Sequence, residues 1–117
     1  GNATCEIARQ LNAKLIITAT SSGFTARMIS RHRPLTPIFA ITSSEQTQRR
    51  LALVWGIRST VVSHKETLEK VIEESLRVAQ QQALVEKGDV VVITAGVPAG
   101  IAGRTNMIQV RTVGEKF

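Results

Sequence analysis

Short apolar runs rich in β-branched residues alternate along this chain with segments of helical periodicity, and this alternation constrains the fold more than any other feature. The predicted strands are residues 14–20, 38–42, 59–62, 90–94 and 106–113. The predicted helices are residues 3–12, 25–32, 44–54 and 64–86. Such alternation is typical of α/β proteins, in which helices cover both faces of a mainly parallel sheet. We therefore expect a three-layer α/β/α sandwich with a five-stranded mixed sheet.

Two of the predicted strands indicate how the sheet is ordered. Val90-Val91-Val92-Ile93-Thr94 lacks the alternation of apolar and polar residues that marks a half-exposed strand, so we expect it to be central and buried on both faces. The strand at 106–113 follows a loop with no helical pattern, whereas long helical crossovers precede the strands at 38–42, 59–62 and 90–94. A parallel neighbour needs a long crossover, so we expect the last strand to be antiparallel.

Capping signals suggest where two helices begin and where one of them ends, and periodicity suggests the buried face of a third. Ser43 with Gln46, and Ser63 with Glu66, have the spacing of capping boxes at the starts of helices 44–54 and 64–86. Gly88 suits the C-terminal cap of the second of these. The first helix, 3–12, is expected to place these apolar residues on its buried face: Ala3, Ile7, Ala8 and Leu11.

Composition excludes several function classes. The chain has 117 residues, of which 43% are hydrophobic, a size and composition that suit one globular domain. With three Phe, one Trp and no Tyr, the core must be aliphatic, and stacking on nucleic-acid bases is not available. The net charge of +6 favours anionic partners, but the basic residues are dispersed, which disfavours a nucleic-acid role. One cysteine allows no disulfide within the chain and suits a reducing, cytoplasmic setting, and no apolar run approaches membrane-spanning length.

A hydroxyl-rich turn after the first predicted strand is the leading candidate site. It supplies side-chain hydroxyls and backbone N–H groups at a helix N-terminus, where the helix dipole favours negative charge. The candidate phosphate-binding residues are Thr20, Ser21, Ser22, Gly23 and Thr25. The structural alternative is an ordinary strand-to-helix turn in which Ser22 or Thr25 caps the helix.

A glycine-rich loop after the strand at 90–94 is the second candidate. It lacks the Gly-Lys-Ser/Thr of a Walker A loop and the spacing of a dinucleotide-binding fingerprint. One interpretation is a loop that closes over a ligand, and the other is a mobile connection to an edge strand. The residues that would contact a ligand are Gly96, Pro98, Gly100, Gly103 and Arg104. If strands 14–20 and 90–94 are neighbours, both loops face one crevice.

No set of residues suggests catalysis or metal binding within this chain. His32 and His64 are the only histidines, and neither has a suitably spaced second ligand. We therefore predict no catalytic residue and no metal site here. The chain starts at Gly1 rather than Met and enters a helical pattern almost at once, so we expect residues 1–117 to be a single domain of a longer chain.

The sequence resembles the C-terminal domain of pyruvate kinase along essentially its whole length. Its residues are most similar to those of Bacillus-type bacterial enzymes. Ser-Gly-x-Thr-Ala-Arg followed by Arg-Pro, and Lys-Gly-Asp-Val-Val followed by Gly and Thr-Asn, occur in the order and spacing of that family. The segments that carry the resemblance are residues 12–18, 20–34, 37–42, 87–96 and 103–108.

The resemblance implies a regulatory role. Pyruvate kinase transfers phosphate from phosphoenolpyruvate to ADP in glycolysis, using magnesium and potassium, at an active site in other domains. The C-terminal domain of this cytoplasmic homotetramer binds the allosteric activator and supplies one subunit interface. The activator's phosphate is expected at the Thr20–Thr25 loop, with the Gly96–Arg104 loop closing over its sugar.

Departures from the animal isozymes bear on the activator and on the role of the pocket. Ser21 and Phe24 stand where some animal isozymes carry Lys or Arg. The segment before helix 64–86 is short and has no counterpart of the Trp and Arg that bind the second phosphate of fructose 1,6-bisphosphate in those isozymes. The candidate activators are therefore AMP, ribose 5-phosphate or a sugar bisphosphate. The rival hypothesis is an assembly module whose ligand pocket is vestigial.

Overall fold

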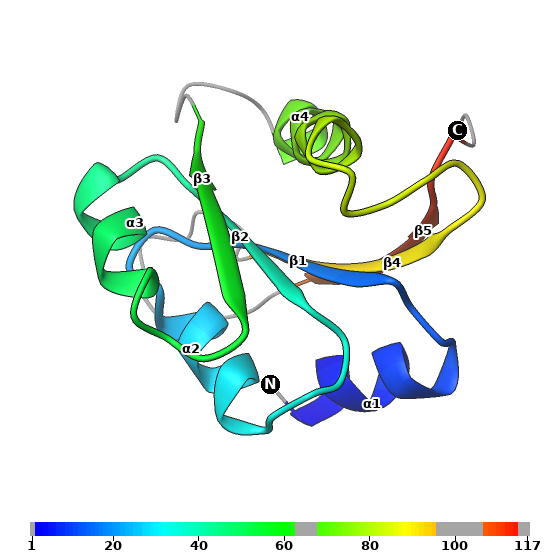
Figure 1. Cartoon of the computed structure of the whole chain (residues 1–117), viewed down its shortest axis with the longest axis horizontal. Helices are drawn as coiled ribbons and strands as arrows, with labels where there is room; N and C mark the ends of the chain where they lie inside the picture. The colour runs from blue at the N-terminus through cyan, green and yellow to red at the C-terminus, as the bar shows by residue number, and fades with distance from the viewer. Residues whose placement is uncertain (1, 63–67, 96–106, 115–117) are drawn as a thin grey trace.

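Five strands form one mixed sheet in the order β3-β2-β1-β4-β5 (Figure 1). The computed structural model describes residues 2–62, 68–95 and 107–114. The strands are β1 Leu15–Ala19, β2 Ile38–Thr42, β3 Ile57–Val61, β4 Val90–Ala95 and β5 Met107–Thr112. The pairs β3–β2, β2–β1 and β1–β4 are parallel, and only β4–β5 is antiparallel. The expected mixed sheet and the antiparallel last strand are both confirmed.

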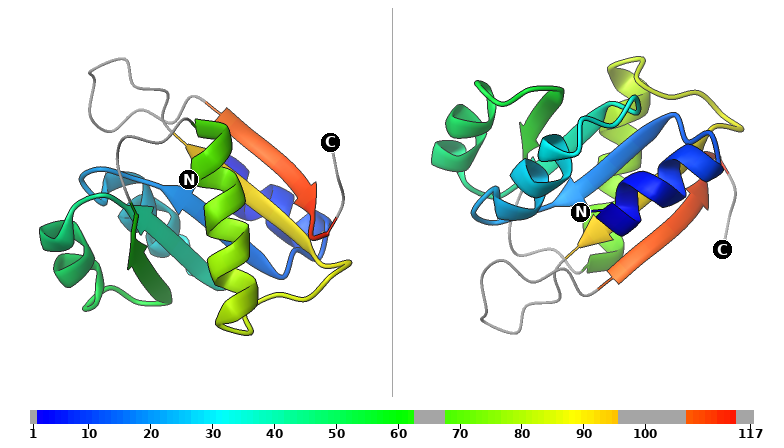
Figure 2. Two further views of the ribbon diagram at one scale, coloured as in Figure 1. Left: turned by 90° about the horizontal axis from the view of Figure 1, so that it is seen from above. Right: turned by 90° about the horizontal axis from the view of Figure 1, so that it is seen from below.

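Helices cover both faces of this sheet, which confirms the three-layer sandwich. The helices are α1 Asn2–Gln10, α2 Phe24–Arg31, α3 Glu45–Leu51 and α4 Leu68–Gln81. Of these described helices, the first three lie against one face and α4 lies against the other (Figures 1 and 2). In the described ranges, none of the helices has the length and hydropathy needed to cross a bilayer.

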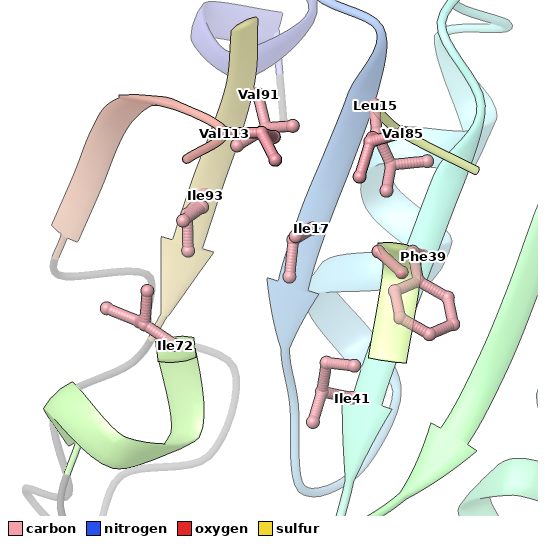
Figure 3. Packing of buried hydrophobic residues seen from close by; sticks show 10 residues of the cluster. Leu15, Ile17, Phe39, Ile41, Ile72, Val85, Val91, Ile93 and Val113 are labelled. Atoms are coloured by element: carbon pink, nitrogen blue, oxygen red, sulfur yellow. The ribbon is translucent and has the colours of Figure 1, made fainter. Parts of the chain in front are cut away.

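The core follows from the near-continuous apolar runs of the central strands. All of β2 is buried, as are five of the six residues of β4, because these strands are covered on both faces. Odd-numbered side chains of β1, β2 and β4 pack toward α4 (Figure 3), and that cluster comprises Leu15, Ile17, Phe39, Ile41, Ile72, Ala79, Val85, Val91, Ile93 and Val113. Even-numbered side chains pack toward α1 and α2, in a cluster of Ala8, Ile16, Ile29, Ile38 and Val92.

Two predicted helix signals are wrong. Ser44, not Ser43, is the N-cap of α3, because the Ser44 hydroxyl accepts the Thr47 N–H at 3.1 Å. The C-terminal cap of α4 is not Gly88, which lies seven residues beyond the last helical residue, in the connection to β4. The predicted helix ended at 86, whereas α4 ends at Gln81. Ser63 and Glu66 lie outside the described residues.

An alanine in the left-handed conformation explains the early end of α4. Ala83 has φ 59°, its N–H donates to the Gln80 carbonyl at 3.0 Å, and the Leu84 N–H donates to the Ala79 carbonyl at 2.9 Å. This pair of bonds is the Schellman motif, which usually carries glycine at the left-handed position. Leu84 then turns back onto the core cluster under α4. The tertiary contact therefore ends the helix at a residue with no sequence signal for a cap.

We expect Ala83→Gly to stabilise the protein. The left-handed conformation strains alanine but not glycine, and the gain should be about 0.5–1 kcal/mol after glycine's larger loss of chain entropy. The measurement is chemical denaturation of the two proteins. The matched control is Ala52→Gly, since Ala52 is also an exposed residue after a helix but has φ −59°. A loss of stability in both variants would contradict the strain at Ala83.

Candidate functional site

The carboxyl ends of β1 and β4 meet at one edge of the sheet. The two strands are adjacent and parallel, with Thr18 opposite Thr94 and Ala19 opposite Ala95. From β1 the chain moves to β2 and β3 on one side, and later returns to β4 on the other side. This reversal of strand order is a topological switch point, where open α/β sheets bind ligands. The expectation that these two strands are neighbours is confirmed.

The hydroxyl-rich turn leaves β1 at this edge and is held by its own side chains. The Thr20 N–H donates to the Ile41 carbonyl at 2.8 Å, which anchors the turn to β2. The Thr20 hydroxyl accepts the Gly23 N–H at 2.9 Å, and the Ser22 hydroxyl accepts the Phe24 N–H at 3.3 Å. These bonds draw the chain into a compact turn that leads directly into α2.

Gly23 occupies the tightest position in the turn. It is the N-cap of α2, with φ 86° in the left-handed region. A β-carbon there would lie 3.2 Å from Leu51 Cδ2 and 3.3 Å from Thr47 Cγ2, both on α3. Glycine is required both by the backbone conformation and by the close approach of α3. The alternative that Ser22 or Thr25 is the helix cap is therefore wrong, because the N-cap residue is Gly23.

Helix α3 supports the turn through contacts that the sequence did not signal. The buried Thr47 hydroxyl donates to the Ser21 carbonyl at 2.8 Å. The same residue's N–H is bonded to Ser44, so the start of α3 is fixed at the same time. Thr47 lies 26 residues from Ser21 along the chain, and only the pairing of β1 with β2 brings the two together. Hence the turn is clamped from both β2 and α3.

The electrostatic surroundings of the turn favour an anion. The first turn of α2 carries no acidic residue, and Arg27 follows one turn into the helix. The N–H groups of a helix's first turn have no acceptor within the helix, and the macrodipole gives that end a partial positive charge. Ser21 is exposed, Ser22 is half-buried and Thr25 is half-buried, so three hydroxyl residues of the turn reach the surface. These features are those expected of a turn that accommodates a phosphate or carboxylate.

The second candidate loop lies outside the described residues. Gly96, Pro98, Gly100, Gly103 and Arg104 all belong to the segment 96–106. Its two neighbours are placed, because Ala95 and Met107 are register partners in β4 and β5. Ala95 is also opposite Ala19, so the first end of the glycine-rich loop lies beside the carboxyl end of β1, and the second end lies one strand further across the sheet.

Among the described residues, the titratable groups with a shifted pKa lie on α1 and α4 rather than in the hydroxyl-rich turn. Among residues 2–62, 68–95 and 107–114 there is no group of three or more His, Cys, Asp or Glu that could hold a metal ion. Burial raises the pKa of the Cys5 thiol, which makes it less reactive at neutral pH. Hydrogen bonds from Arg9 and Arg77 lower the pKa of Glu6 and Glu74, but these are exposed pairs on helix surfaces.

Comparison with known proteins identifies the family. A family model described as the pyruvate kinase alpha/beta domain matches residues 1–111. The pyruvate kinase of Lactobacillus delbrueckii subsp. bulgaricus is 40% identical over 117 residues, which are 100% of this chain and 20% of that protein. The pyruvate kinase of Clostridium acetobutylicum is 42% identical over 110 residues, which are 94% of this chain and 23% of that protein. The chain thus spans about a fifth of the length of these relatives.

Solved structures agree with this assignment. A crystal structure of a pyruvate kinase from Cryptosporidium parvum matches with a TM-score of 0.85 and 33% identity, over 95% of this chain and 21% of that one. The Cryptosporidium parvum pyruvate kinase in complex with ADP matches with a TM-score of 0.85 and 32% identity, over 95% and 22% of the two chains. At this identity and coverage both sequence and fold are shared. The chain therefore belongs to the pyruvate kinase family and corresponds to its alpha/beta domain.

Proposed function

We propose that this chain is the regulatory domain of a pyruvate kinase and that its Thr20–Thr25 turn binds a phosphorylated metabolite. The observation that carries the proposal is the position of the turn, which joins β1 to the N-terminus of α2 at the switch point between β1 and β4. Residues 1–117 act as one domain of a longer protein. The whole protein transfers phosphate from phosphoenolpyruvate to ADP, with magnesium and potassium, at a site that this chain does not contain.

The hydroxyls of the turn are suited to donate to phosphate oxygens. A hydroxyl has one proton to donate and two lone pairs that accept. The hydroxyls of Thr20 and Ser22 already accept backbone N–H groups, and that bonding leaves the proton of each available for an acceptor. Ser21 presents a third, exposed hydroxyl. A phosphate oxygen accepts only, so its chemistry complements hydroxyl and N–H donors together.

The glycine-rich loop supplies the rest of the proposed site. Gly96, Pro98, Gly100, Gly103 and Arg104 would close over the sugar of the metabolite, from the strand end next to the phosphate. AMP, ribose 5-phosphate and a sugar bisphosphate are the candidate effectors. Regulation follows from differential affinity, since an effector shifts an equilibrium only toward the state that it binds more tightly.

A subunit-interface role is the second candidate function, and β5 favours it. Among the described strands β5 pairs only with β4, so its other edge is open. Two apolar side chains of this edge strand, Ile108 and Val110, are 40% and 44% exposed. An open strand edge with exposed apolar side chains is a ready surface for a second copy. In a homotetramer this role and effector binding coexist, whereas in a pure assembly module the pocket is vestigial.

Ligand-dependent thermal unfolding tests the proposed effector site. The chain is heated with AMP, ribose 5-phosphate, fructose 1,6-bisphosphate, glucose 6-phosphate or inorganic phosphate. A ligand at about 100 times its dissociation constant adds about 2.7 kcal/mol of stability, which raises the midpoint by several degrees. No shift with any ligand, together with self-association in sedimentation, would favour the assembly module instead.

Ser22→Asp is expected to weaken effector binding at least about tenfold, because a fixed carboxylate repels phosphate at close range. Titration of the midpoint shift against ligand concentration measures the change. Ser43→Asp is the matched control, since Ser43 is exposed at the same sheet edge but follows β2 rather than β1. Equal loss in both variants would indicate general repulsion at the edge, and no loss in Ser22→Asp would refute the assigned turn.

A further inference from the structure

Two threonine hydroxyls are buried side by side beneath the sheet edge that carries both loops. Thr18 of β1 and Thr94 of β4 are register partners, and each is 0% exposed. Within the described residues, neither Oγ1 atom has a hydrogen-bond partner. Both side chains project to the face of Ile16 and Val92, which packs against α1 and α2. An unpaired buried hydroxyl costs free energy, and valine has the same shape without that cost.

A third buried threonine lies on the same side of the sheet, in α1. Ala8 of α1 packs in one cluster with Ile16 and Val92. Four residues earlier in α1 comes Thr4, which is 2% exposed, about 6 Å along the helix axis from Ala8. Two residues further along each strand come Thr18 and Thr94, about 6.6 Å beyond Ile16 and Val92. Figure 2 shows that α1 runs antiparallel to β1 and β4. Steps of this length in opposite directions bring Thr4 to about the level of the two strand threonines.

We propose that Thr4, Thr18 and Thr94 form a buried site for one ordered water molecule. Neighbouring strands lie about 4.8 Å apart, a span between paired residues that one water bridges with two ordinary hydrogen bonds. Buried waters typically make about three hydrogen bonds to groups that otherwise lack partners. Two strand hydroxyls and one helix hydroxyl supply that number.

The water site ties three elements together at the switch point. One molecule bonded to α1, β1 and β4 would fix the ends of the two strands from which the hydroxyl-rich turn and the glycine-rich loop depart. The inference depends on the burial of the three threonines and on the register and unpaired hydroxyls of Thr18 and Thr94, and it holds whether or not the turn binds a phosphorylated metabolite.

A double-mutant cycle with valine tests the site. Thr18→Val and Thr94→Val preserve shape and remove one hydroxyl each. We expect each single variant to lower the unfolding midpoint by about 3–6 °C, because the water loses a partner. The midpoint of the double variant should fall by less than the sum of the two single decreases, because no water remains in a site that has become apolar. A high-resolution crystal structure of this chain should place a water within about 3.2 Å of the three Oγ1 atoms.

Two outcomes would overturn the proposal. If both single variants raise the midpoint and their effects add, the hydroxyls are unpaired and no water binds between them. If sodium or potassium raises the midpoint of the unaltered chain above its value in choline at the same ionic strength, and the valine variants lose that difference, the site binds a cation instead of water. Thr42→Val is the control, since Thr42 is equally buried in β2 but its hydroxyl accepts the Ser44 N–H at 3.2 Å. Its effect should add to that of either variant.

Discussion

Gly23→Ala is expected to lower the free energy of unfolding by about 2–4 kcal/mol, as the sum of backbone strain and overpacking. The residue has φ 86°, which L-amino acids rarely adopt. The added methyl would also lie 3.2 Å from Leu51 Cδ2 and 3.3 Å from Thr47 Cγ2, tighter than ordinary carbon contacts. Leu51 is fully buried and cannot turn away into solvent. Chemical denaturation measures the loss.

Gly56→Ala separates the two causes of that loss. Gly56 has φ 72°, but a β-carbon there would meet nothing within 4 Å. It therefore carries the backbone strain alone, about 1–2 kcal/mol. The difference between the two variants reports the contact of α3 with the turn. If Gly56→Ala costs as much as Gly23→Ala, the packing of Thr47 and Leu51 against the turn contributes nothing.

The same contact shows why the candidate site was only partly predictable from the sequence. The hydroxyl-rich run and its place after an apolar strand are local features, and they located the turn correctly. The clamp by Thr47 depends on a residue 26 positions away, and no local pattern identifies it. Gly23 was predicted as one of the phosphate-binding residues, and the nearest atoms to its missing side chain belong to α3. Tertiary packing therefore gives this glycine a structural role as well.

The strands were predicted more accurately than the helix ends. Strand 38–42 was predicted with its observed bounds, because Pro37 precedes it and Ser43 follows a mainly apolar run. Helix α3 was predicted to reach residue 54 but ends at Leu51. The buried face of α1 was also partly wrong, since Ala3 and Leu11 are exposed and Thr4 is buried. Helical periodicity left the orientation of such a short helix undetermined, and packing on β4 fixed it.

Phe39→Ala is expected to produce the largest loss of stability, about 3–5 kcal/mol. Phe39 is 0% exposed and is the largest fully buried side chain in the described residues. It projects from the middle of β2 into the cluster beneath α4, with Ile17 and Ile41 beside it (Figure 3). The total free energy of unfolding of a domain of this size is about 5–15 kcal/mol, so the variant would unfold at a much lower temperature. Calorimetry of the two proteins measures the change.

Phe24→Ala makes the matched control, because Phe24 is 42% exposed at the start of α2. The same atoms are removed there from a side chain that packs against few neighbours, so the loss should stay below about 1 kcal/mol. Near-equal losses in the two variants would contradict the placement of Phe39 in the core. Phe39 packs in the same cluster as α4, the one described helix on that face of the sheet. The amide protons of α4 should therefore be the first to lose protection from hydrogen exchange in the Phe39 variant.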